Sequence, residues 1–268
     1  MATRYSRSGP PSPLHSLMEF RGLLELAALP YAVPLLMNVP KGDGHPVLLL
    51  PGFMADEKTL FALKTYLDYL GYEVETWGFG RNVGFQLKHA KALEQKVRYM
   101  HHKHGRKLSL VGWSLGGVFA MYAAHQAPEC VRSVVTLGSP VSTDAGGSET
   151  SALVKALYRA IAHPMGPAAH SAHPRAKVMQ GRPPMPASCL YSLSDGVVPP
   201  QDATIDGDPA MHENIRVPGS HVGLGFNALV LWIVADRLAQ AEGAWKPFEP
   251  SGILGRIYQL TTNDAVPA

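Results

Sequence analysis

The sequence contains few cysteines and little net charge, and its N-terminal region has no uncharged run long enough to cross a membrane. Only two of its 268 residues are cysteine, and neither a zinc-ligand spacing nor a disulfide-rich pattern is present. The net charge of +3 gives no reason to expect nucleic acid as a partner, because nucleic-acid-binding domains usually carry a clustered basic face. In the N-terminal region the longest uncharged run, Leu26 to Pro40, is too short to span a bilayer as a helix.

Apolar residues are abundant. They make up 46% of the chain, which is enough to form a substantial hydrophobic core. The N-terminal extension, residues 1–44, begins like a signal peptide, with two arginines before an apolar region. That region is interrupted by charged residues and then broken by prolines, at Glu19, Arg21, Glu25, Pro30 and Pro34. We therefore expect a cytoplasmic protein, and secretion remains an alternative. Residues 17–29 predict an amphipathic helix that packs on the protein's own surface or makes a peripheral membrane contact.

From residue 45 onward, strand-like and helix-like segments alternate. The strands are predicted at 45–52, 72–79, 107–114, 131–140, 187–195 and 213–220. The helices are predicted at 55–71, 86–104, 115–127 and 225–240. This alternation predicts an α/β fold: a mainly parallel central sheet of about six strands with helices on both faces.

One segment interrupts the alternation. Residues 144–186 contain a helix-like stretch followed by dense proline and glycine, which predict little regular structure. We expect a lid or cap insertion here, over the carboxyl edge of the sheet where function collects in such folds. The core domain then comprises residues 45–143 and 187–245, and residues 246–268 form a C-terminal tail.

A serine between two glycines ends the strand predicted at 107–114. The pentapeptide Gly112-Trp113-Ser114-Leu115-Gly116 follows LSLV and precedes GVFAMYAA, so it has the strand–turn–helix context of a nucleophile elbow. Such a turn strains the serine backbone, requires small residues two positions away and points the hydroxyl out of the sheet. The pattern indicates Ser114 as a nucleophile; an ordinary tight turn is the alternative.

An aspartate and a histidine follow the last two predicted strands. At Asp195 a carboxylate can orient an imidazole and compensate its charge, although Asp-Gly is also a turn dipeptide. Asp144 is a rival for this role, and Asp202 is less well placed. His221 is one of twelve histidines but stands out because it begins the turn after the last strand. The order Ser114, Asp195, His221 is that of one hydrolase architecture.

The loop after the first strand reads Pro51-Gly52-Phe53-Met54. Acyl transfer needs N–H donors for the oxyanion of its tetrahedral intermediate. The residue after the nucleophile, Leu115, would supply one, and Phe53 would supply the other, with Gly52 allowing close approach of the backbone. An ordinary Pro-Gly turn is the alternative.

Together these motifs resemble the α/β-hydrolase fold superfamily, in particular its lipases and carboxylesterases. The resemblance covers about residues 45–241 and rests on PGF at 51–53, GWSLGG at 112–117, SLSDGVVP at 192–199 and GSHVGLGFN at 219–227. It implies Ser114 as nucleophile, His221 as general acid/base and Asp195 as the acid, with Phe53 and Leu115 as oxyanion-hole donors. The chain departs from the family in having Pro-Gly where His-Gly is usual, and in lacking evident first and second strands of the eight-stranded fold.

Apolar residues surround the candidate catalytic positions and predict an apolar acyl or alcohol pocket: Met54, Trp113, Val197, Val198, Val222 and Leu224. The expected activity is hydrolysis of apolar carboxylic esters, by a carboxylesterase or small lipase that needs neither a metal nor an organic cofactor. An acyltransferase or thioesterase of the same fold is an alternative, and a non-catalytic binding protein is another.

Overall fold

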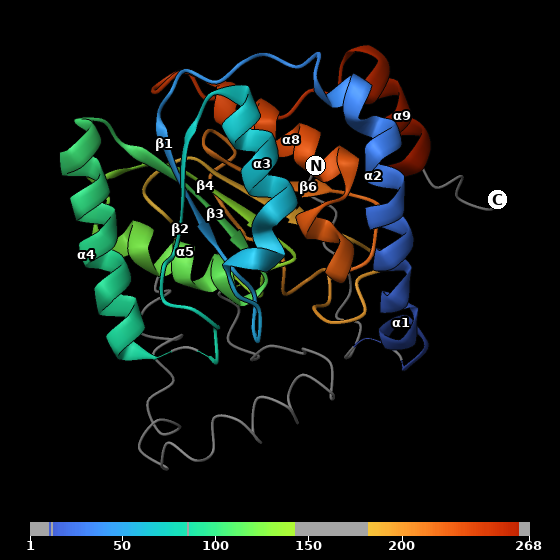
Figure 1. The fold of residues 1–268 in the computed structure, drawn as a ribbon, viewed down its shortest axis with the longest axis horizontal. Coiled ribbons are helices and arrows are strands. Elements are labelled where there is room, and N and C mark those ends of the chain that lie inside the picture. The colour runs from blue at the N-terminus through green and yellow to red at the C-terminus, as the bar shows by residue number, and fades with distance from the viewer. Residues whose placement is uncertain (1–10, 12, 85, 143–181, 263–268) are drawn as a thin grey trace.

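The computed structural model describes residues 11, 13–84, 86–142 and 182–262 (Figure 1). Within these residues a six-stranded sheet has the order β2-β1-β3-β4-β5-β6, and every neighbouring pair is parallel. The strands are β1 Pro46–Leu50, β2 Glu73–Thr76, β3 Leu108–Trp113, β4 Val131–Leu137, β5 Ala187–Tyr191 and β6 His212–Arg216. The predicted α/β class and the parallel six-stranded sheet are confirmed.

Helices cover both faces of the sheet. On one face, η2 (Glu57–Leu60), α3 (Phe61–Leu70) and α8 (Ala228–Ala239) pack on apolar side chains of the strands. On the other, α4 (Leu87–His104) and α5 (Leu115–Gln126) do the same. Every residue of β1, β3 and β5 is buried, as expected for parallel strands between two helical layers. Each fully buried leucine contributes roughly 1.5–3 kcal/mol to this core.

The last two strands are shorter than the sequence predicts. β5 ends at Tyr191 and β6 ends at Arg216, so the segments that carry Asp195 and His221 have already left the sheet as loops. A hydrogen bond of 2.6 Å from the Ser192 hydroxyl to the Gly219 carbonyl joins the two loops. Neighbouring parallel strands therefore deliver both side chains to one edge of the sheet.

The N-terminal segment forms α1 (Pro13–Leu17), η1 (Met18–Arg21) and α2 (Gly22–Leu36). The expectation that Pro30 and Pro34 break this segment is wrong, because α2 continues through both. The two prolines are exposed and four residues apart, so both missing N–H groups lie on the same exposed side of α2. No helix in the described part of the chain is both long and apolar enough to cross a membrane.

Two further regions bear on the expected domain boundaries. Within the segment 246–268, residues Gly252–Thr262 form α9, and Tyr258 packs edge-on to Trp232 of α8 and to Phe248. A 3-10 turn, η5 (Val222–Gly225), leads into α8. Most of the predicted insertion 144–186, including Asp144, lies outside the described residues, which resume at residue 182.

Candidate active site

Ser114 occupies a strained turn between β3 and α5. Its φ of 53° and ψ of −121° lie where residues other than glycine rarely occur. Such a conformation costs about 1–3 kcal/mol and persists only where its surroundings hold it. Here the Ser114 N–H donates to the carbonyl of Leu137 over 2.8 Å, which fixes the turn to the end of β4.

The glycines on either side of Ser114 are required by close backbone contacts. A Cβ on Gly112 would lie 2.4 Å from the Cα of Gly117, and one on Gly116 would lie 2.2 Å from the Leu50 carbonyl oxygen. Both distances are far below van der Waals contact, so no larger residue fits. The turn therefore has the backbone of the nucleophile elbow that the sequence pattern predicts.

Asp195 and His221 form a buried hydrogen-bonded pair. Oδ2 of Asp195 lies 2.7 Å from Nδ1 of His221, and because a carboxylate only accepts, Nδ1 is the donor. Oδ1 accepts from the N–H groups of Val197 and Val198 at 2.8 and 2.7 Å. Both oxygens of Asp195 are therefore engaged, and the ring of His221 is held in one tautomer with Nε2 free of the proton.

Burial alone would lower the pKa of His221, because it penalises the imidazolium. The charge of Asp195, its hydrogen bond to Nδ1 and the charge of Glu19 act in the opposite direction and outweigh burial. The pKa of His221 is therefore raised above its usual 6.5. The site favours the charged ring, which is the form a general base takes after accepting a proton.

Contacts through Trp113 and Gly138 bring Ser114 and the Asp195–His221 pair to one place. Trp113, the residue before Ser114, donates its Nε1–H to the His221 carbonyl over 3.1 Å. Gly138 follows Leu137, the partner of the Ser114 N–H, and has a φ of 54°. A Cβ on Gly138 would lie 2.9 Å from Oδ2 of Asp195 and 3.1 Å from Nδ1 of His221.

The loop after β1 lies against Ser114. A Cβ on Gly52 would be 3.2 Å from the Cβ of Ser114. Met54 has a φ of 62°, and its N–H donates to the Asn82 carbonyl over 2.7 Å. The Asn82 side chain, fully buried, donates to the Pro51 carbonyl over 2.8 Å. Asn82 is therefore hydrogen-bonded to this loop on both sides of Phe53 and fixes its backbone, a role that the sequence analysis missed.

The residues predicted to line an apolar pocket differ in burial. Trp113, Val198 and Leu224 are buried, Met54 and Val197 are half-buried, and Val222 is 40% exposed. Leu224 packs in the core beside Gly138, so it supports the site from beneath. The rival acid Asp202 is buried in the loop after Val198.

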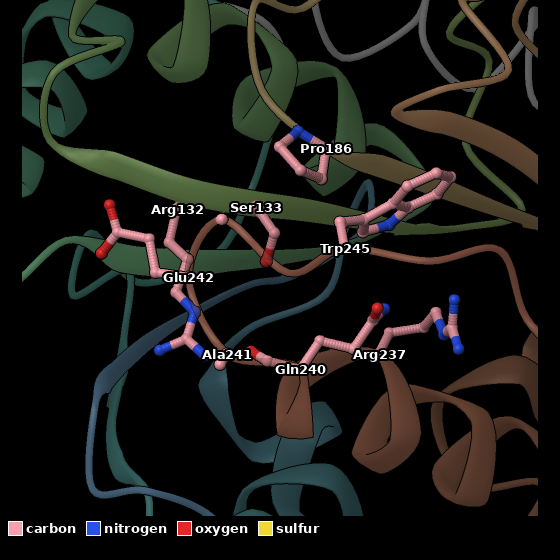
Figure 2. A pocket seen from close by; sticks show the side chains of 9 residues that line it. Arg132, Ser133, Pro186, Arg237, Gln240, Ala241, Glu242 and Trp245 are labelled. Carbon is pink, nitrogen blue, oxygen red and sulfur yellow. Dashed lines mark hydrogen bonds between the residues drawn. The ribbon is translucent and has the colours of Figure 1, made fainter.

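A pocket at the opposite edge of the sheet is too small for an ester substrate. Figure 2 shows it beside the first residues of β4, Arg132 and Ser133, with Pro186 before β5 and Arg237 of α8. Its volume of about 20 Å³ has room for a single water molecule. The candidate site lies instead at the carboxyl ends of the strands, the edge where open α/β sheets bind their ligands.

The sequence analysis also missed the contribution of the N-terminal helices. Their charged residues Glu19, Arg21 and Glu25 turn inward and bond to the loops that carry Asp195 and His221. The available signal was weak: these are the only Asp, Glu, Lys or Arg residues between Leu14 and Pro40. Nothing in the local pattern indicated their partners.

Comparisons with known proteins agree with this fold. Residues 77–159 match the family model of the alpha/beta hydrolase fold. A pimeloyl-[acyl-carrier protein] methyl ester esterase of Citrobacter koseri is 39% identical over 66 residues, 25% of each chain. Serine hydrolase BPHL of Mus musculus is 29% identical over 108 residues, 37% of each chain. The matched region thus spans well under half the length of either curated relative.

Solved structures extend the likeness to most of the chain. A structure from work on the metagenome-derived lipolytic enzymes LipS and LipT has a TM-score of 0.52 at 18% identity, covering 74% of this chain and 95% of that one. The lipase BlEst2 of Bacillus licheniformis in its mature form has a TM-score of 0.52 at 16% identity, covering 75% and 95%. The parallel sheet, the strained serine turn and these likenesses lead to one conclusion: the chain is a protein of the α/β-hydrolase fold.

Proposed function

We propose that this protein is a serine hydrolase that cleaves carboxylic esters with apolar acyl or alcohol groups, as a carboxylesterase or small lipase does. The observation that carries the proposal is the 2.7 Å hydrogen bond between Asp195 and His221, next to a serine held at a φ of 53°. A nucleophile, a base and a group that orients the base are the parts that covalent ester hydrolysis requires.

In the proposed mechanism Ser114 is the nucleophile. Nε2 of His221 takes the hydroxyl proton while Oγ attacks the ester carbonyl, and Asp195 stabilises the imidazolium. The tetrahedral intermediate collapses with cleavage of the ester C–O bond, and His221 returns its proton to the departing alcohol. Water, activated by the same imidazole, then attacks the acyl-enzyme and releases the carboxylic acid and free Ser114.

Two backbone N–H groups would stabilise the oxyanion in each tetrahedral intermediate. Leu115 is the first residue of α5, and the first N–H groups of a helix have no intrahelical acceptor. Phe53 would supply the second from the loop that contacts Ser114 through Gly52. Preorganised donors of this kind are worth about 10²–10³ in kcat each.

The chemistry of the relatives supports esters as the substrate class. The Citrobacter koseri protein is named a methyl ester esterase, and the Bacillus licheniformis protein a lipase. The half-exposed and exposed side chains of Met54, Val197 and Val222 offer apolar surface next to the proposed machinery. We propose that these three side chains contact the apolar part of the ester, with Trp113, Val198 and Leu224 packed behind them.

The test is hydrolysis of p-nitrophenyl esters of short and long acyl chains by wild type and Ser114→Ala. Wild type should cleave at least one series, and the alanine variant should retain a thousandth or less of that rate. A fluorophosphonate probe should label wild type at Ser114 and leave the variant unlabelled. No cleavage together with no labelling would favour a non-catalytic binding protein.

Added alcohol and thiol acceptors distinguish hydrolysis from transfer. A hydrolase should release free acid at an unchanged rate when acceptors are present. Accumulation of the transferred ester or thioester in preference to free acid would instead assign an acyltransferase.

A further inference from the structure

One carboxylate near the N-terminus bonds to both loops that carry the proposed acid–base pair. Oε1 of Glu19 accepts from the N–H of Gly196 at 2.7 Å and from the N–H of His221 at 3.1 Å. Oε2 accepts from the N–H of Val222 at 2.9 Å. Gly196 directly follows Asp195, so a single side chain holds the backbone beside the acid and the backbone of the base.

The neighbouring residues strengthen this arrangement. Arg21 donates to the carbonyls of Ser194 and Gly219, so it bridges the same two loops from their acceptor side. Glu25 accepts from the Ser220 N–H at 2.7 Å and from the Asn227 side chain at 2.9 Å. Figure 1 shows why the N-terminal side chains can reach these loops: α1 and α2, in blue, lie beside the orange segments that follow β5 and β6.

We propose that Glu19 is a positioning residue of the active site: it locks the two loops together and so keeps Asp195 and His221 within hydrogen-bonding distance. The inference rests on the proposed function, because it concerns the base of that reaction. Glu19 touches no reacting atom; it acts through backbone groups adjacent to the pair. The three N–H groups donate to one carboxylate, so these are charge-assisted hydrogen bonds, which are stronger than neutral ones.

Glu19 also acts on His221 through its charge. Burial lowers the pKa of His221, while Asp195 first and Glu19 second raise it by their negative charges. Among the described residues, Arg21 and Glu25 also bond to these loops, the backbone of His15 lies against Gly196, and Asp202 lies in the same loop as Asp195. Loss of the Glu19 charge should therefore lower the pKa of His221, even though Asp195 still bonds to the imidazole.

The variant Glu19→Gln tests both effects. The amide keeps the shape of the side chain but has one acceptor oxygen in place of two, and it carries no charge. We expect kcat on a p-nitrophenyl ester to fall about 10- to 100-fold through misplacement of the base. The acid limb of kcat/KM should move to lower pH, because a neutral His221 is needed and its pKa falls.

Glu25→Gln is the matched control, since it is the same change on the same N-terminal segment and Glu25 bonds to neither Gly196 nor His221. Its acid limb should stay at the wild-type pH even if its melting temperature falls. An equal shift in both variants, or a wild-type acid limb and kcat in Glu19→Gln, overturns the inference. Activity of wild type and its loss in Ser114→Ala are measured alongside, so failure of the proposed function is recognised separately.

A second variant covers the case in which Glu19→Gln does not fold. Glu19→Asp keeps the charge but shortens the reach by one methylene. It should lower kcat while leaving the acid limb close to that of wild type. Full wild-type kcat in a folded Glu19→Asp protein contradicts a positioning role.

Discussion

The indole N–H of Trp113 donates to the backbone carbonyl of His221 over 3.1 Å, between residues 108 positions apart in the chain. The bond connects the residue before the proposed nucleophile to the residue proposed as its base. Both groups are buried, and the two rings lie 6.5 Å apart between centroids. The relative placement of Ser114 and His221 therefore depends in part on the indole of Trp113, which bonds to the backbone of His221.

Trp113→Phe should weaken both stability and activity. The substitution removes the indole donor and leaves the buried His221 carbonyl with the longer 3.4 Å hydrogen bond from the Leu224 N–H, which costs about 0.5–1.5 kcal/mol of the free energy of unfolding. It also releases the His221 loop, so kcat/KM should fall. Urea unfolding and ester hydrolysis measure the two effects. Trp245→Phe, at the opposite edge of the sheet, should leave kcat/KM unchanged; equal losses in both variants would contradict the role assigned to Trp113.

Asp195→Asn should separate the proposed acid from its rival. The asparagine Oδ1 can still accept from Val197 and Val198, but its amide would face Nδ1 of His221 as a donor. The imidazole then adopts the wrong tautomer, and kcat should fall about 10⁴-fold in a folded protein. Asp202→Asn should retain most of the wild-type kcat. A larger loss in the Asp202 variant would reassign the acid.

Gly138→Ala should damage the site through a steric collision. Its Cβ would lie 2.6 Å from Cδ1 of Leu224 and 2.9 Å from Oδ2 of Asp195, so both side chains must shift, and we expect the hydrogen bond from Asp195 to His221 to be disturbed. Gly71→Ala is the control, because Gly71 also has a positive φ, 95°, but nothing within 4 Å of an added Cβ. Both variants should lose about 1–2 kcal/mol of stability through backbone strain. Only Gly138→Ala should also lose tenfold or more in kcat; an intact kcat there would show that Asp195 tolerates the methyl group.

His45 provides a pH-dependent prediction about stability. It is fully buried at the amino edge of the sheet, where Nδ1 bonds to Asp43 at 2.5 Å and Nε2 to the Ser109 hydroxyl at 2.9 Å. Burial lowers its pKa, and this outweighs the opposing effect of Asp43. The unfolded chain therefore takes up the proton first, and the free energy of unfolding should decrease as the pH falls below about 6.5.

His45→Gln should remove that part of the pH dependence. His221, whose pKa is raised, contributes with the opposite sign, because its stabilisation is lost as the pH increases through the raised pKa. The difference in unfolding free energy between wild type and His45→Gln, measured from pH 5 to 8, isolates His45. A difference that does not change with pH would contradict a lowered pKa. The kcat of the variant should stay at the wild-type value, because Asp43, His45 and Ser109 lie away from the carboxyl edge.

The contrast between the two Asp–His pairs shows how far residue type alone leads. Asp43, His45 and Ser109 are an aspartate, a histidine and a serine linked in series, as in a catalytic triad, but His45 and Ser109 are fully buried. Ser114 differs because it follows a strand and begins a helix between glycines that no other residue can replace. That difference is local, so the sequence pattern was enough to predict the strained turn at Ser114.

The amino-acid sequence by itself determined the alternation of strands and helices, the strained turn at Ser114 and the order of Ser114, Asp195 and His221. All of these depend on neighbouring residues: apolar periodicity, small side chains beside a sharp turn, and the residue that follows a strand. The tertiary structure alone decided what holds these loops in place. Glu19 bonds to backbone groups about 200 positions away, and Gly138 matters because of the atoms that surround it. Backbone N–H groups are the same in every residue except proline, so no side-chain pattern in the sequence marks which of them a distant carboxylate will meet.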